Sequence, residues 1–149
     1  MRIMLIILAV LAVVGVLGLL LRRGLLVSRV RGGSMLPTYQ DGDKLLAVRR
    51  GLFRRLRAGD VVVCRLPAGF AIPGGGDNPL LVKRVGAVAG DPRPGGDGAT
   101  DPLPAGTIYV VGDSPGHSLD SNTFGPLPEK LVVGVVVRRM SGVQPSQSR

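Results

Sequence analysis

The sequence predicts a mostly β protein, with a small antiparallel β-sheet or barrel-like domain behind one N-terminal transmembrane helix. Three observations lead to this fold class. An unbroken apolar run opens the chain, six short apolar segments rich in β-branched residues follow it, and turn-forming residues separate those segments. The chain of 149 residues contains 23 Gly and 12 Pro but only 3% aromatic residues, and Gly and Pro disfavour helix interiors.

The N-terminal segment is a candidate membrane helix. Ile3–Leu21 contains no charged or polar side chain. As a helix it would span roughly 28 Å, close to the hydrocarbon thickness of a bilayer. A cleaved signal peptide is the alternative, but such a peptide ends at a small-residue cleavage site. Here Arg22 and Arg23 follow large apolar residues, so we expect a retained anchor over residues 1–23.

The arginines near this helix bear on its orientation and on its partners. Four of them follow the helix within ten residues, whereas only Arg2 and the amino group precede it. The positive-inside rule therefore predicts that the following domain stays in the cytoplasm. The net charge of +9 and the Arg49–Arg57 cluster suit an anionic surface, so membrane lipid is an expected partner. No zinc-finger spacing or aromatic RNA-binding motif accompanies them, and we expect no nucleic-acid partner.

Six segments after the helix have strand character, and turn signals such as "QDGD", "RAGD" and "PGGGDNP" separate them. They predict one domain over residues 24–141, and the polar residues 142–149 are expected to form a disordered tail. The six segments are Leu25–Arg31, Lys44–Arg50, Asp60–Leu66, Leu80–Gly90, Thr107–Asp113 and Leu131–Arg139.

Ser34 is a candidate nucleophile in the stretch "RGGSMLPTYQDGD", where it lies between a glycine pair and Met-Leu-Pro. A serine hydroxyl attacks efficiently only when a base takes its proton. The single histidine allows a triad of Ser34, His117 and Asp120. A lysine can serve instead when burial lowers its pKa from the usual value of about 10.4. Lys83 lies within the apolar segment "LLVKRVGAV", although a mid-strand lysine can also face solvent.

A third polar stretch, Val110–Gly125, leaves a predicted strand and gathers three serines, a histidine and two aspartates. One interpretation is an ordinary loop held by its own Asp and Ser side chains. The other is a loop whose hydroxyls orient a lysine amine and whose carboxylates fix the backbone of a site.

The sequence offers little support for disulfide or metal chemistry. Cys64 has no second cysteine to pair with and lies in "VVVCRL", so we expect a buried strand residue. No His or Cys spacing typical of a metal site occurs, and we expect neither a metal nor a cofactor.

Together, the stretches "GGSMLPTYQDGD", "LLVKRVGAVAGD" and "GDSPGHSLDSNTFG" resemble, in this order, the serine, lysine and Gly-Asp/Ser-x-Asp-Ser boxes of type I signal peptidases. The resemblance extends over Val30–Arg139. All three boxes in order behind a membrane anchor make it specific. It implies that Ser34 is the nucleophile and that Lys83 is the general base of a Ser–Lys dyad.

The resemblance also implies roles for residues around this dyad. Ser118 matches a serine whose hydroxyl helps to orient the lysine. Asp120, Arg84 and Asp113 match charged positions that support the site. The backbone N–H of Ser34 is an expected donor to the oxyanion of the transition state.

The sequence departs from the family pattern at two positions near the site. Gly32 stands where some members carry a second donating serine, so the oxyanion hole would depend on backbone groups or water. Asn122 stands where many members have arginine, which would remove an ion pair with Asp120. Only about thirty residues separate Lys83 from Asp113, so we expect the large extra domain of some members to be absent.

The resemblance implies a membrane-bound serine endopeptidase that cleaves signal peptides or leader segments of pre-proteins at small residues. The family places its catalytic domain outside the cytoplasm, here on a single-pass plasma-membrane anchor. The arginine distribution predicts the opposite, which would mean a cytoplasm-facing leader or propeptide maturation protease.

Two other interpretations compete with a membrane peptidase. Self-cleaving LexA-like repressors have a similar Ser–Lys fold, but they carry a DNA-binding domain where this chain has an apolar helix. A non-catalytic basic β module held at the membrane would use the Arg49–Arg57 cluster.

Overall fold

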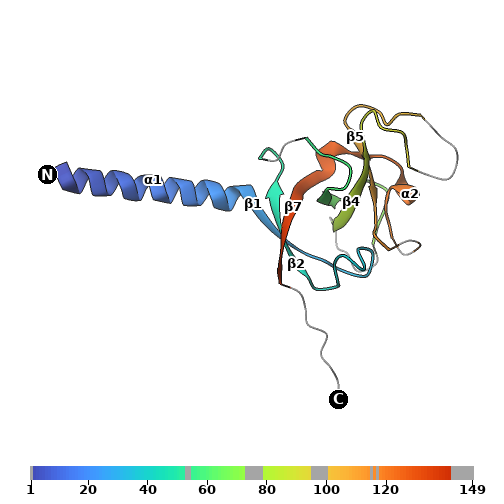
Figure 1. Ribbon diagram of the computed structural model, residues 1–149, viewed down its shortest axis with the longest axis horizontal. Helices are drawn as coiled ribbons and strands as arrows, with labels where there is room; N and C mark the ends of the chain where they lie inside the picture. Colours follow the sequence, from blue (N-terminus) through green and yellow to red (C-terminus); the bar gives the residue numbers. More distant parts are fainter. Residues whose placement is uncertain are drawn as a thin grey trace, which may run out of the picture.

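The structure, a computed structural model, describes residues 2–52, 55–72, 79–94, 101–114, 116 and 118–141. It confirms a mostly β fold, in which one antiparallel sheet follows a single N-terminal helix (Figure 1). The helices are α1 (Arg2–Gly24) and α2 (Ser121–Phe124), and a short 3-10 helix covers Glu129–Leu131. The strands are β1 (Leu25–Arg29), β2 (Lys44–Arg49), β3 (Val61–Arg65), β4 (Leu80–Val88), β5 (Thr107–Val111), β6 (Leu127–Pro128) and β7 (Val132–Ser141).

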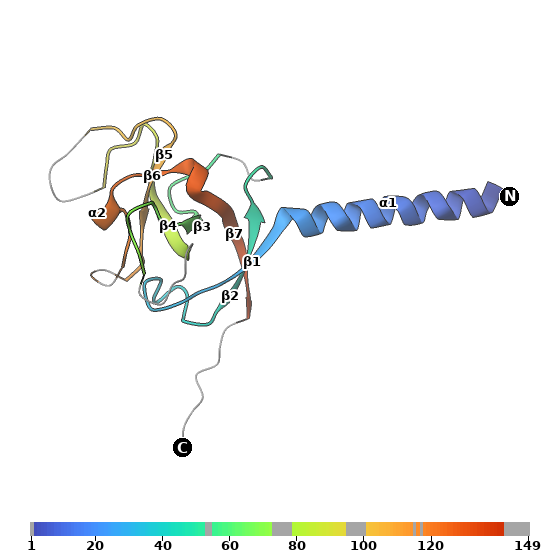
Figure 2. The same ribbon diagram turned by 180° about the vertical axis from the view of Figure 1, so that it is seen from behind.

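α1 is an apolar helix that projects away from the sheet and continues directly into β1 (Figures 1 and 2). It has 23 residues and a mean hydropathy of 3.2 in its apolar window, so it is long and apolar enough to cross a membrane. The large apolar side chains from Ile3 to Leu19 are all exposed. The helix meets the domain at Gly24, which packs against Leu52. Length and composition therefore indicate a single-pass membrane protein.

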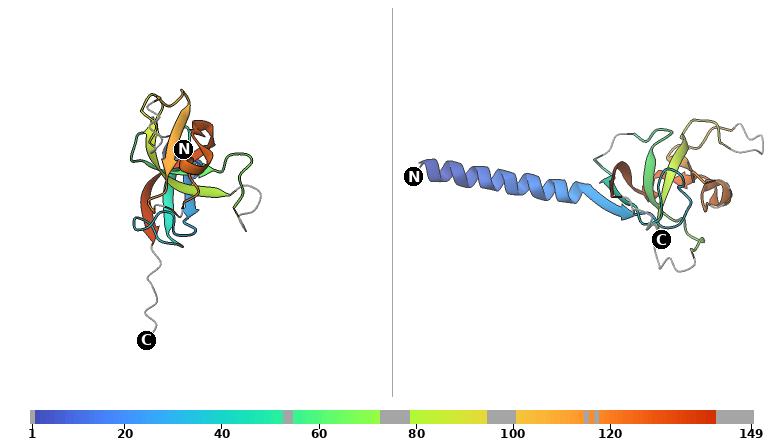
Figure 3. Two further views of the ribbon diagram at one scale, coloured as in Figure 1. Left: turned by 90° about the vertical axis from the view of Figure 1, so that its right-hand side faces the viewer. Right: turned by 60° about the horizontal axis from the view of Figure 1, so that its bottom comes forward.

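The seven strands form one sheet in the order β1-β2-β7-β3-β4-β5-β6, and every neighbouring pair is antiparallel. Figure 3 shows the strands gathered into a curled layer at the end of the helix. Six strands overlap the predicted segments. The sequence did not predict β6 or the single turn of α2. Segments this short carry no recognisable hydrophobic period. The predicted disordered tail, residues 142–149, lies outside the described residues.

The core lies on both faces of the sheet, and β3 contributes to both. Val61 and Val63 pack in one apolar cluster, whereas Val62 and Cys64 pack in the other. This division follows from the alternation of side chains along a strand. Cys64 is fully buried, as predicted, and burial raises the pKa of its thiol to about 12. The thiol is therefore an inert core group.

A variant that lacks residues 2–23 is expected to fold, because no residue of α1 belongs to the apolar core clusters of the described residues. Its thermal unfolding, followed by circular dichroism, should be a single cooperative transition like that of the full chain in detergent micelles. A gradual transition in the shortened protein alone would show that the domain depends on the helix.

Candidate active site

Lys83 is a buried charged residue in the middle of β4, with only 2% of its surface exposed. It shares a strand face with Leu81 and Val85, which both belong to the apolar cluster that contains Cys64. Its Nζ donates a hydrogen bond to Ser118 Oγ at 2.9 Å. Alternation along β4 therefore points this amine into the core, where a polar loop meets it.

Burial sets the protonation of this amine. Loss of hydration lowers the pKa of Lys83, whereas the carboxylates of Asp120 and Asp113 oppose this shift. The guanidinium of the neighbouring Arg84 is paired with the carboxylate of Asp113, so its positive charge is compensated there.

Asp120 anchors the loop that carries Ser118. Its carboxylate is 3% exposed and accepts hydrogen bonds from the backbone N–H of Gly112 (2.9 Å) and of Asn122 (3.0 Å). Burial alone would raise the pKa of Asp120, but hydrogen bonds from Gly112, Ser118 and Asn122 hold it below its usual value. The Ser118 hydroxyl thus lies between the Lys83 amine and an ionised carboxylate.

Asn122 takes part in this arrangement, although the sequence suggested only the loss of an ion pair. Its side-chain amide donates to Asp120 Oδ1 at 3.0 Å, and its carbonyl oxygen accepts from the Tyr109 hydroxyl at 3.0 Å. An amide therefore contacts the carboxylate where an arginine was expected. Nothing in the sequence pattern singled out Tyr109.

Ser34 lies half-buried in the turn that follows β1. Its carbonyl oxygen accepts from the backbone N–H of Ser114 at 3.1 Å. A Cβ placed on Gly112 would lie 2.7 Å from the same oxygen and would collide with Ser118 Oγ. Hence the serine turn and the partner of Lys83 both contact Gly112, a residue that the sequence did not single out.

Three observations on hydrogen bonding describe the surroundings of Ser34. Within the described ranges, no hydrogen bond joins Ser34 Oγ to Lys83 Nζ; such contacts are often long before a substrate binds. The backbone N–H of Gly32 already donates to Asp41 Oδ1 at 2.7 Å. The backbone N–H of Ser34 has no acceptor among the residues that the structure describes, so it is open to an oxyanion.

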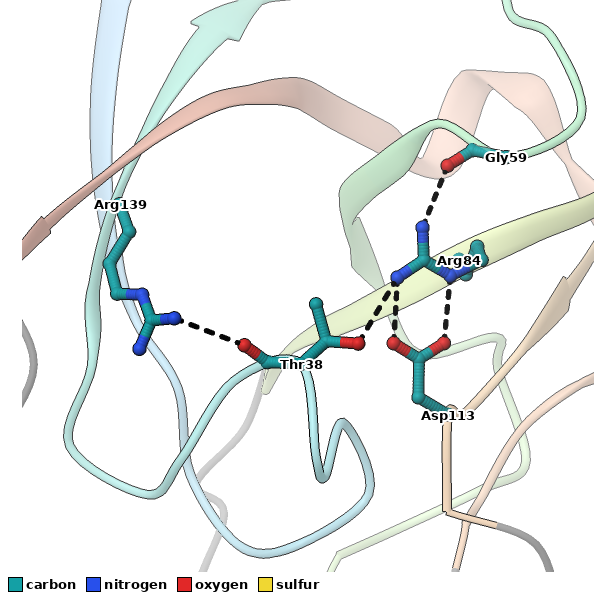
Figure 4. Close-up of polar contacts among 5 residues, drawn as sticks. All are labelled: Thr38, Gly59, Arg84, Asp113 and Arg139. Carbon is teal, nitrogen blue, oxygen red and sulfur yellow. Dashed lines mark hydrogen bonds and ion pairs between the residues drawn. The ribbon is translucent and has the colours of Figure 1, made fainter.

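Arg84 and Asp113 form a two-pronged ion pair beside this site (Figure 4). Arg84 Nε and a terminal nitrogen contact the two carboxylate oxygens at 2.8 and 2.7 Å, and Arg84 also donates to the carbonyl of Gly59 at 3.0 Å. The Arg84 guanidinium, with a smaller contribution from the Thr38 hydroxyl, holds the pKa of Asp113 below its usual value. The pair fixes the start of the Asp113–Asp120 loop against β4.

A cleft of about 370 Å³ opens beside Ser34. Two strand edges bound it. β1 is the first strand of the sheet, and β4 pairs with β5 only from Arg84 onward. The lining residues are 27–31 and 79–82 on the two edges, with Ser34, Met35 and Ile72 between them.

The alternative base, His117, lies outside the described residues. No group of three or more His, Cys, Asp or Glu side chains suited to a metal ion occurs within the described ranges. Contacts therefore connect the residues of the candidate site, which are Lys83, Ser118, Asp120 and Gly112. Ser34 contacts this set through Gly112, and the Arg84–Asp113 ion pair lies beside it.

The sequence matches the family described as signal peptidase, peptidase S26, over residues 1–92 and 95–141. It is 35% identical over 120 residues to mitochondrial inner membrane protease subunit 2 of Schizosaccharomyces pombe, covering 74% of this chain and 62% of that protein. It is 35% identical over 118 residues to mitochondrial ATP-independent inner membrane protease subunit 1b of Arabidopsis thaliana, covering 73% and 66%. It is also 30% identical over 136 residues to signal peptidase I V of Bacillus subtilis, covering 72% and 81%.

The chain spans less than two thirds of the first two relatives. The family match, however, runs over nearly its whole length, from the apolar helix to the last strand. The resemblance inferred from the three boxes is thereby confirmed, and the chain belongs to the signal peptidase family.

Proposed function

We propose that this chain is a single-pass membrane serine endopeptidase that cleaves signal peptides or leader segments of pre-proteins. Ser34 is the nucleophile and Lys83 the general base. The observation that carries this assignment is the amine of Lys83, which is buried in the core yet hydrogen-bonded to a serine of the neighbouring loop. An ordinary lysine places its ammonium group in solvent and stays charged. Burial of the Lys83 amine favours the neutral form instead.

The first step transfers a proton and forms an ester. Neutral Lys83 Nζ takes the proton of Ser34 Oγ while that oxygen attacks the carbonyl carbon of the peptide bond. Negative charge then develops on the carbonyl oxygen, and the open N–H of Ser34 is placed to donate to it. As the C–N bond breaks, the Lys83 ammonium returns its proton to the leaving amine, and an acyl ester remains on Ser34.

The second step hydrolyses that ester by the same route. Lys83 takes a proton from water, the hydroxide attacks the ester carbonyl, and the proton returns to Ser34 Oγ as the new carboxyl product leaves. Ser118 keeps the amine oriented through both steps. Asp120 and Asp113 stabilise the ammonium that forms transiently, because their carboxylates lie near it.

The cleft supports an extended peptide as substrate. The unpaired edges of β1 and of the first residues of β4 face it, and an added strand could hydrogen-bond to both. Apolar residues such as Met35 and Val82 line part of the cleft, which suits the small side chains that the family resemblance implies. A pre-protein whose cleavage site is extended is therefore the proposed substrate.

We further propose that the anchor lies in the plasma membrane with the catalytic domain outside the cytoplasm, as the family resemblance implies. The arginines after α1 favour the opposite orientation, in which the chain would mature leader peptides or propeptides in the cytoplasm. Protease treatment of spheroplasts distinguishes the two. Digestion of the sheet domain in intact spheroplasts supports the first orientation, and its protection supports the second.

Ser34→Ala and Lys83→Ala are each expected to reduce kcat on a fluorogenic leader peptide by more than about 1,000-fold, because nucleophile and base act as one unit. The double variant should be no worse than either single variant. Lys130→Ala, on an exposed lysine, is the matched control and should keep full activity. Cleavage by Lys83→Ala would instead point to His117, and His117→Ala would then be the inactivating change.

The pH dependence should follow Lys83. kcat/KM is expected to rise with pH through the lowered pKa of this lysine, because only the neutral amine accepts a proton. Between that value and the usual lysine pKa of about 10.4, the unfolded chain binds more protons, so the free energy of unfolding rises with pH. It is lowest below the folded pKa. Lys83→Met should remove this dependence and make the protein more acid-stable, as urea unfolding at several pH values will show.

Gly112→Ala should impair catalysis, because the added methyl group would displace Ser118 Oγ or the carbonyl of Ser34. We expect a loss of roughly 100-fold in kcat, typical of a misplacement near 1 Å. Gly86→Ala is the matched control, since a methyl group there comes no closer than 3.6 Å to its neighbours. Equal activity of the two variants would contradict the contact between Gly112 and both serines.

A further inference from the structure

Asp43 is a buried carboxylate at the end of the turn that carries Ser34. Its surface is 0% exposed. Oδ2 accepts from the backbone N–H of Gln40 at 3.0 Å and from a terminal nitrogen of Arg139 at 3.1 Å, while Oδ1 has no hydrogen-bond partner within the described residues. A buried carboxylate is costly unless it is paired, and Arg139 is its partner.

Arg139 reaches this turn from β7, which is 96 positions away along the chain. A second terminal nitrogen of its guanidinium donates to the carbonyl oxygen of Thr38 at 3.4 Å (Figure 4), and its central carbon lies 5.6 Å from the centroid of the Tyr39 ring. One guanidinium thus contacts three residues of the same turn. The N–H of Tyr39 donates to the carbonyl of Met35 at 2.9 Å, so these residues belong to the hydrogen-bonded unit next to Ser34.

Thr38 connects this unit to the strand of the lysine. Its hydroxyl oxygen lies 3.5 Å from a terminal nitrogen of Arg84, and it also hydrogen-bonds to Asp113. Figure 4 shows Thr38 between the two arginines, with its carbonyl toward Arg139 and its hydroxyl toward Arg84. Arg84 follows Lys83 directly in β4. The serine turn is therefore tied to β7 on one side and to β4 on the other.

We propose that Arg139 is a positioning residue for Ser34, acting through Asp43 and Thr38. Arg139 holds the turn that carries Ser34 in the position from which Ser34 Oγ can reach Lys83 Nζ. The inference rests on the proposed function of these two residues. It assigns to β7, the last strand and outside all three boxes, a part in the geometry of the proposed dyad.

A purely structural role for Arg139 makes a different prediction from a positioning role. If Arg139 only compensates the buried carboxylate, a chain with Asp43→Asn and Arg139→Gln should recover both stability and activity, because no buried charge is left unpaired. If Arg139 also holds Thr38, the same double variant recovers stability but not kcat, since the contact between guanidinium and carbonyl is still lost.

The test uses full-length protein in detergent micelles. kcat and KM are measured with a fluorogenic leader peptide, and Tm is measured by thermal unfolding. Arg139→Gln is expected to lower kcat roughly 10- to 100-fold with KM changed by less than about twofold, because a small misplacement of the nucleophile affects the chemical step. The double variant should regain the Tm of the unmodified chain and keep the low kcat. Arg138→Gln removes the same charge from the neighbouring, exposed residue and should change neither.

Wild-type kcat in Arg139→Gln, or in the stable double variant, would overturn the positioning role. Should Arg139→Gln fail to fold, the double variant decides, because Asp43→Asn leaves no buried carboxylate without its partner. The unmodified chain and Ser34→Ala belong in the same assay. If the unmodified chain and Ser34→Ala cleave the peptide equally, or if neither cleaves it, the proposed function is wrong and this inference is wrong as well. If they differ while Arg139→Gln matches the unmodified chain, the inference alone fails.

Discussion

Burial of one amine, that of Lys83, is the constraint on which the rest of the site depends. A lysine in an apolar cluster loses hydration, and the loss favours its neutral form. Two nearby carboxylates would restore the charge if they lay in direct contact with it, but each has other partners. Asp113 is held by Arg84, and Asp120 is held by backbone N–H groups of its own loop. Among the described residues, the amine hydrogen-bonds to the hydroxyl of Ser118, which orients it without requiring that it be charged.

The charged groups around the proposed dyad of Ser34 and Lys83 mainly hold neighbouring elements in place. The Arg84–Asp113 pair ties β4 to the start of the Ser118 loop, and the Arg139–Asp43 pair ties β7 to the Ser34 turn. Thr38 contacts both arginines. Partly exposed ion pairs contribute little to stability by themselves, but a buried carboxylate that loses its partner costs much more. These two ion pairs therefore contribute more to the geometry of the site than to the free energy of unfolding.

Local patterns in the sequence predicted much of this molecule. Apolar runs of β-branched residues gave six of the strands, and the position of Lys83 within one of them indicated a buried lysine. The long-range contacts could not be predicted in the same way. Arg139 and Asp43 lie 96 positions apart, and no periodicity predicts that a guanidinium on β7 will reach the carboxylate that precedes the neighbouring strand β2.

Other features were missed for related physical reasons. Gly112 opens the last box, but the sequence assigned it no role, because the missing side chain matters only when two neighbours pack against that position. Asn122 looked like a lost ion pair, yet a short amide can reach the same carboxylate when Tyr109 holds its other end. The pairing of Arg84 with Asp113 was missed as well, because the two residues lie 29 positions apart in the sequence.

The central claim is that the Lys83 amine is neutral over the pH range in which the enzyme works. Its titration can be measured directly by NMR, with lysine labelled at Cε and the Lys83 signal identified by its loss in Lys83→Met. The account predicts a titration midpoint well below the usual lysine pKa of about 10.4 in the folded chain, and an ordinary midpoint after unfolding in urea. A folded-state midpoint at or above the usual value would mean that the amine is charged, and it would contradict the proposed role of Lys83 as the base.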